Sequence, residues 1–148
     1  MRIEAGNLIS VASIVAGFGI TVIMFRVQRE LSIQESRPTL RSTLAWSDYL
    51  IIASVFLALL GSVEVLLLDP AVPHYLQAVA AAACAAAVFL QVGYIPGILF
   101  HYGIRYGRNS TIDDRQSGEP GERAIVILSA VVALLVAAWV FRQHLQAQ

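Results

Sequence analysis

Four long apolar stretches constrain this chain more than any other feature. They cover residues 5–25, 49–68, 75–104 and 124–141, and the only Asp, Glu, Lys or Arg inside them is Glu64. A helix needs about 20 residues to cross the roughly 30 Å hydrocarbon core of a bilayer, and each stretch has about that length or more. A backbone in lipid must also satisfy its own hydrogen bonds, which favours helices. The sequence therefore predicts an all-α integral membrane protein built as a bundle of four transmembrane helices.

The composition agrees with a bilayer as the solvent. Only 14% of the residues are charged, whereas soluble domains carry about 25%. The formal net charge is zero, so no global field attracts nucleic acid. No linker or soluble module interrupts the chain, which predicts a single transmembrane domain over residues 1–148. All ten basic residues are Arg in a chain rich in Ala, Val and Leu, which indicates a high-GC genome and hence a bacterial inner membrane.

The arginines also predict the orientation. Eight of the ten lie in two connecting segments, 26–48 and 105–123, and the short second connection has none. Arginine-rich loops stay in the cytoplasm, so both termini are expected on the non-cytoplasmic side and the helices run up, down, up and down.

Three features predict where the helices begin, end or bend. Ser47 is the expected N-cap of the second helix, which has Asp48 in its first turn. The first helix is expected to continue into the cytoplasm until Pro38 stops it. The third helix is predicted to be long and kinked at Pro96, because proline removes a backbone hydrogen bond.

Small residues predict the faces on which helices meet, because membrane helices associate through close packing rather than through burial of apolar area. One stripe runs along the first helix at spacings of three and four residues, and a shorter one runs along the second. The predicted helix-packing residues are Gly6, Ser10, Ser13, Gly17, Ser54, Ala58 and Gly61.

Polar residues near the outer ends of the spans form one candidate site. Glu64 is the only acidic residue well inside a span, and an intramembrane carboxylate is a functional candidate by default. Asn7, His74 and Gln77 fall at the same predicted depth, so the four could form a cluster that binds a cation or a proton. Alternatively, Glu64 reaches the headgroup region or forms a structural pair.

Gln91 is the second candidate. Gln77, Cys84 and Gln91 recur every seven residues and so share one stripe of the third helix. An amide near the middle of the membrane is costly unless it is paired. Gln91 therefore either bonds to another helix and fixes the packing, or lines a polar path together with Gln77.

A third candidate lies at the inner end of the third helix, where a ligand or lipid headgroup could bind. Its residues are Tyr94, His101, Tyr102 and Arg105. The alternative is a bent helix with an interfacial aromatic belt.

The leading functional prediction is a non-enzymatic subunit that assembles with itself or with other membrane proteins. No catalytic motif, metal-binding spacing or nucleotide loop is apparent, so an enzyme is not favoured and no metal or cofactor is expected. The alternative is a homo-oligomeric ion channel or ion- or proton-coupled transporter with a polar path along the second and third helices.

Overall fold

The computed structural model describes residues 5–36, 45–64, 73–101 and 112–146, and this part of the chain is helical without strands. Its four helices are α1 (Ala5–Ser36), α2 (Asp48–Ala58), α4 (His74–His101) and α5 (Ile112–Gln146). A short π-helix, η1 (Leu59–Glu64), continues α2. The predicted all-helical class is therefore confirmed.

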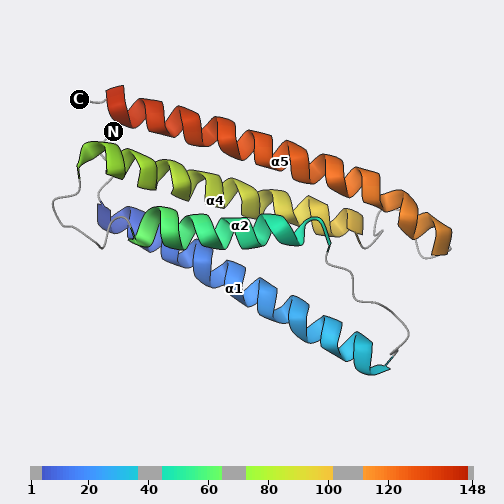
Figure 1. The fold of residues 1–148 in the computed structure, drawn as a ribbon. Coiled ribbons are helices and arrows are strands. Elements are labelled where there is room, and N and C mark those ends of the chain that lie inside the picture. The colour runs from blue at the N-terminus through green and yellow to red at the C-terminus, as the bar shows by residue number, and fades with distance from the viewer. Residues whose placement is uncertain (1–4, 37–44, 65–72, 102–111, 147–148) are drawn as a thin grey trace.

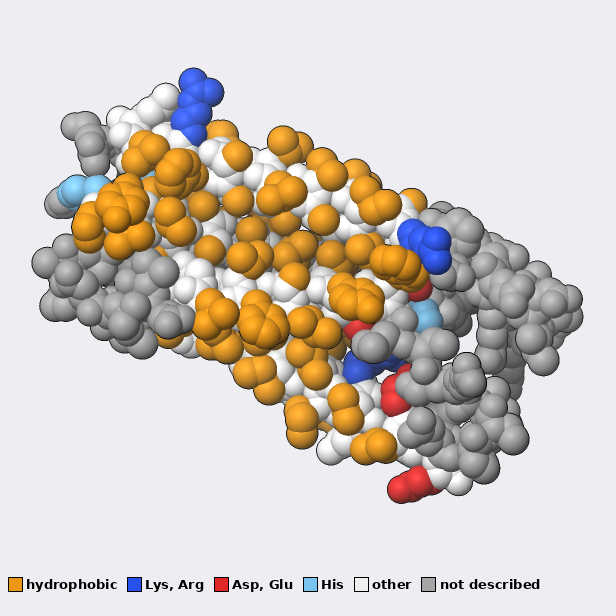
Figure 2. Space-filling model, in the orientation of Figure 1, with side chains coloured by type: hydrophobic (Ala, Val, Ile, Leu, Met, Phe, Trp, Pro, Cys, Tyr) orange, Lys and Arg blue, Asp and Glu red, His pale blue; other side chains and the backbone are white. Residues whose placement is uncertain are grey.

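Three helices are long and apolar enough to cross a membrane, which agrees with the predicted membrane class. The qualifying segments are Gly6–Ser32, His74–His101 and Gly121–Gln146. The apolar helix Asp48–Val63 is shorter, and the last residues of the predicted second span lie outside the described residues. On the face drawn in Figure 2, hydrophobic side chains cover the middle of the helices and charged side chains gather near the two ends.

The helices lie side by side in the order α1, α2, α4 and α5 (Figure 1). α4 is central, because it packs against α1, against α2 with η1, and most extensively against α5. The start of α1 and the end of α5 lie at the same end of the bundle (Figure 1).

The core consists largely of alanine, so the helix backbones come close together. One cluster joins Ala12 and Ala16 of α1 to Ala58 and to the alanine tract of α4. A second cluster joins Leu50 and Ile51 of α2 to larger side chains of α4. Small side chains allow this close approach, which is how helices gain packing energy in a membrane.

Two helix boundaries refine the sequence-based expectations. α1 continues to Ser36, as expected for a first helix that extends beyond its apolar span. α5 begins at Ile112, whereas the sequence predicted a connection up to residue 123. Further along α5, Gly121 lies against the Phe100 ring and Glu122 is buried and hydrogen-bonded, so the helix is held against α4 at these two residues.

Candidate functional site

A buried carboxylate, Glu122, joins three segments at the end of the bundle where α2 begins. Its side chain is 2% exposed. The backbone N–H and the hydroxyl of Ser47 both donate to Glu122 Oε1, at 2.8 and 2.9 Å. His101 Nδ1 lies 3.0 Å from Glu122 Oε2. Both carboxylate oxygens are therefore engaged, and one side chain of α5 links the α2 N-terminus to the end of α4.

A second buried carboxylate lies on the next residue after Ser47. Asp48 accepts hydrogen bonds from Arg26 of α1 at 3.1 and 2.8 Å, in a two-pronged arrangement. It also accepts the Ala45 N–H at 3.0 Å. Arg26 and Asp48 side chains are only 12% and 9% exposed, and Arg26 also approaches Glu30 at 3.7 Å. We call Arg26, Ser47, Asp48, His101 and Glu122 together the polar network.

The local sequence explains why the network forms at this position. Ser47 is the N-cap residue of α2, as predicted, but its hydroxyl makes no capping hydrogen bond and donates to Glu122 instead. Asp48 in the first turn supplies the acceptor for Ala45 instead. A Cβ added at Gly97 of α4 would lie 2.8 Å from the Ser47 Cβ, so glycine lets α4 approach this turn closely.

The structure places the inner-end candidates in different environments. Tyr94 is buried in the core cluster with Leu50, and His101 pairs with Glu122. Tyr102 and Arg105 lie outside the described residues. The remaining network residues were missed from sequence because they flank the apolar spans and looked like ordinary loop charges.

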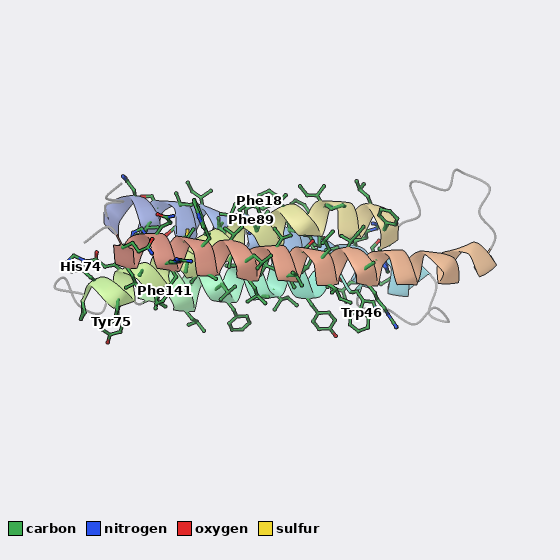
Figure 3. All side chains as sticks on the ribbon, turned by 90° about the horizontal axis from the view of Figure 1, so that it is seen from above. Phe18, Trp46, His74, Tyr75, Phe89 and Phe141 are labelled. Carbon is green, nitrogen blue, oxygen red and sulfur yellow. The ribbon has the colours of Figure 1, made fainter. Side chains whose placement is uncertain are left out.

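The structure describes the side chains of three of the four outer-end candidates, and the predicted cluster around Glu64 stays a prediction. Asn7 and His74 are exposed, and Gln77 is half-buried. Glu64 is the last residue of η1, and its side chain lies outside the described part. His74 and Tyr75 are at the end of the bundle opposite Trp46 (Figure 3).

Gln91 connects two helices in the interior. Its amide nitrogen donates to the Val15 carbonyl oxygen of α1 at 2.5 Å. A Cβ added at Gly19 would lie 3.0 Å from that same amide nitrogen, so α1 and α4 are close here. This bond gives the mid-membrane amide a partner and ties α4 to α1.

The two small-residue stripes face in different directions. In the α2 stripe, Ser54 and Ala58 are fully buried, and a Cβ added at Gly61 would lie 2.6 Å from the Ala83 Cβ of α4. The α2 stripe therefore packs against another helix of the same chain. The α1 stripe is instead exposed along its length, at Gly6, Ser10, Ser13, Gly17 and Thr21.

The site offers ion pairing and hydrogen bonding rather than an evident reaction centre. Among the described residues, no three His, Cys, Asp or Glu side chains gather as a metal site. No family model, curated protein or solved structure matches this chain.

Proposed function

We propose that this protein is a non-enzymatic, multi-pass membrane subunit that works by assembling with further copies of itself. In this proposal all four helices span a bacterial inner membrane in up-down-up-down order, with α4 kinked at Pro96. The arginine-rich segments 26–48 and 105–123 lie in the cytoplasm and both termini lie outside.

The main support for this proposal is that the α1 stripe, which runs from Gly6 to Thr21, faces away from the other helices. The buried positions Leu8, Val15 and Gly19 lie on one side of α1, and the stripe lies on the opposite side, about 180° around the helix. A Cβ added at Gly6 or Gly17 would meet nothing within 4 Å. The described part of the chain therefore leaves this face uncovered.

The chemistry of the stripe suits another helix better than lipid. Ser10 donates to the Gly6 carbonyl at 2.9 Å and Thr21 donates to the Gly17 carbonyl at 2.8 Å. The hydroxyls of Ser10 and Thr21 are thus satisfied within α1, and every residue of the stripe is small and uncharged. Membrane helices associate on such faces because small side chains let their backbones approach.

A second copy is the partner that fits this face. A stripe of small, uncharged residues can pack against its own copy, and a two-fold axis would bring the same residues of both copies together. Large exposed side chains, such as Leu134 of α5 and Ile14 beside the α1 stripe, suit contact with lipid tails.

The test is the mass of the purified chain in mild detergent, measured by light scattering that subtracts the detergent. The unaltered protein should have a multiple of its 16.0 kDa mass, and Gly17→Leu should shift it to the monomer. Ala138→Leu, on the exposed surface of α5, is the matched control and should leave the mass unchanged. A monomeric unaltered protein, or an oligomer that survives Gly17→Leu, would contradict the proposal.

The channel or transporter alternative has less support. It requires Gln91 to face a polar path, whereas the Gln91 amide bonds to a backbone carbonyl of α1. Ion flux in liposomes that changes in Gln91→Leu and Glu64→Gln, with the oligomer intact, would favour this alternative.

A further inference from the structure

The exposed side of α1 carries a seven-residue repeat that is longer than the small-residue stripe. Beyond Gly17, exposed apolar residues continue at the same alternating spacing of three and four residues. The complete series, which we call the seam, consists of Gly6, Ser10, Ser13, Gly17, Ile20, Met24, Val27 and Leu31. The next position of the repeat is the polar Gln34, so the seam ends at Leu31.

The seam lies on the side of α1 that faces away from the other helices. Leu8, Ala12 and Val15 are buried in the core cluster with α4, and at about 100° per residue the seam lies on the opposite side of the helix. Its four larger side chains are between 47% and 55% exposed, and they are Ile20, Met24, Val27 and Leu31. The described part of the chain therefore leaves the whole seam uncovered.

The seam also continues past the end of the predicted membrane span. Counted from Gly6, about 20 residues of helix cross the hydrocarbon core, which ends near Arg26, the partner of Asp48. Leu31 lies about 7 Å further along the helix axis, at 1.5 Å per residue. The last turns of α1 run past the start of α2 and away from the other helices (Figure 1). Acyl chains do not reach this level, so lipid does not account for the apolar residues Val27 and Leu31 there.

A seam of this kind suits a second helix. When apolar residues repeat every seven positions, an ideal helix drifts by about 20° per repeat, and two helices wind left-handed around each other to keep their seams in contact. Such helices cross at about 20° and stay close over their whole length. Glycine and serine in the first half of the seam allow the backbones to approach, and the larger side chains of the second half can interlock.

The orientation of the chain makes the two helices parallel. The arginine-rich segments give every copy the same orientation, so a two-fold axis between two copies stands perpendicular to the membrane. Each seam residue then faces its own counterpart in the other copy. Phe18 and Phe25, which are 58% and 68% exposed, point about 100° away from the adjacent seam residues and remain toward lipid.

We propose that α1 pairs with α1 of a second copy along the whole seam, as two parallel helices that cross left-handed, from Gly6 within the membrane to Leu31 on its cytoplasmic side. This pairing rests on the self-assembly proposed above, and it adds the direction, the hand and the length of the contact.

The test is disulfide cross-linking of single cysteines in the full chain, embedded in membranes. Cys84 is the only cysteine, so Cys84→Ala gives a background without thiols. In that background, oxidation should convert most of Leu31→Cys and of Met24→Cys to a dimer of twice the 16.0 kDa mass, because a disulfide needs Cβ atoms about 4 Å apart. Ser32→Cys and Phe25→Cys, at the exposed neighbouring positions, are the matched controls and should remain monomeric.

A charge in the seam gives a second measurement without cysteines. Leu31→Asp places two carboxylates opposite each other in the pair, where like charges repel. Light scattering in mild detergent should then show a lower fraction of dimer, whereas Ser32→Asp should leave that fraction unchanged.

The results that would overturn this pairing can be told apart from a failure of self-assembly. Cross-linking of Ser13→Cys without cross-linking of Leu31→Cys would show that the two helices diverge, and equal cross-linking of Leu31→Cys and Ser32→Cys would show that no defined face is in contact. A dimeric mass without any cross-link along α1 would assign the contact to another surface. Self-assembly would stand in these three cases, whereas a monomeric mass of the unaltered protein would contradict both proposals.

Discussion

Ser47 and Glu122 are 75 positions apart in the sequence, yet the backbone N–H and the hydroxyl of Ser47 both donate to the same oxygen of Glu122. This relationship joins the start of α2 to the start of the α5 span. With His101 on the other carboxylate oxygen, it fixes how three helices meet.

Removing the Glu122 carboxylate should destabilise the fold. Glu122→Ala leaves the buried N–H and hydroxyl of Ser47 without their acceptor, and each unsatisfied buried group costs about 1–3 kcal/mol. The free energy of unfolding, measured by titrating sodium dodecyl sulfate into mild-detergent micelles, should fall by at least that amount. Glu35→Ala, at an exposed position of α1, is the control and should change it little. Equal effects of both substitutions would remove the structural role of Glu122.

Replacing only one partner of the Arg26–Asp48 pair should lower the free energy of unfolding more than replacing both partners. Asp48→Leu leaves a largely buried guanidinium without its main partner, at a cost of about 3–5 kcal/mol. The double variant Arg26→Met and Asp48→Leu removes both charges and should recover much of that loss. The same detergent titration, arranged as a double-mutant cycle, measures the coupling. A double variant that is as unstable as the sum of the single variants would show that the two residues act independently.

Gly93 should be intolerant of even one added methyl group. A Cβ at Gly93 would collide with the Ser129 side chain of α5. Gly93→Ala should therefore push α4 and α5 apart and cost about 1–3 kcal/mol. Ala138→Val, which enlarges a side chain on the exposed surface of α5, is the control and should change the free energy of unfolding by no more than about 0.5 kcal/mol. Equal tolerance at both positions would contradict the close approach of α4 and α5.

Loss of the hydroxyl should affect the free energy of unfolding differently at two buried serines, one in α2 and one in η1. Ser62 Oγ donates to the Ala80 carbonyl at 2.8 Å, so Ser62→Ala should cost about 0.6 kcal/mol, a typical value between membrane helices. The buried Ser54 hydroxyl has no partner within the described part of the chain, so Ser54→Ala should be neutral or stabilising. The free energies of unfolding of the two variants test this expectation. A larger loss of stability in Ser54→Ala than in Ser62→Ala would reveal a partner for the Ser54 hydroxyl.

Local patterns predicted the helices well and their outward contacts less well. The lengths and near absence of charge in the apolar stretches were enough to predict the helical class, and the small side chains along α1 and α2 predicted two packing faces. Spacing alone could not tell that the Ser54–Ala58 face packs inside the chain while the Gly6–Gly17 face is exposed. Which face is covered depends on how each helix is rotated about its axis, and a regular stripe of small residues has the same spacing in either case.

The sequence likewise showed how many charged residues each segment carries, but it did not show which of them form pairs. By themselves the apolar runs determined that the chain forms helices long and apolar enough to cross a bilayer, because a crossing needs about 20 apolar residues in a row. Asp48 and Glu122 looked like ordinary charges beside spans, since nothing local identifies the partner of a carboxylate. Only the tertiary structure decided that both turn inward, and that Arg123 is thereby placed over Trp46, because those contacts join residues far apart in the chain.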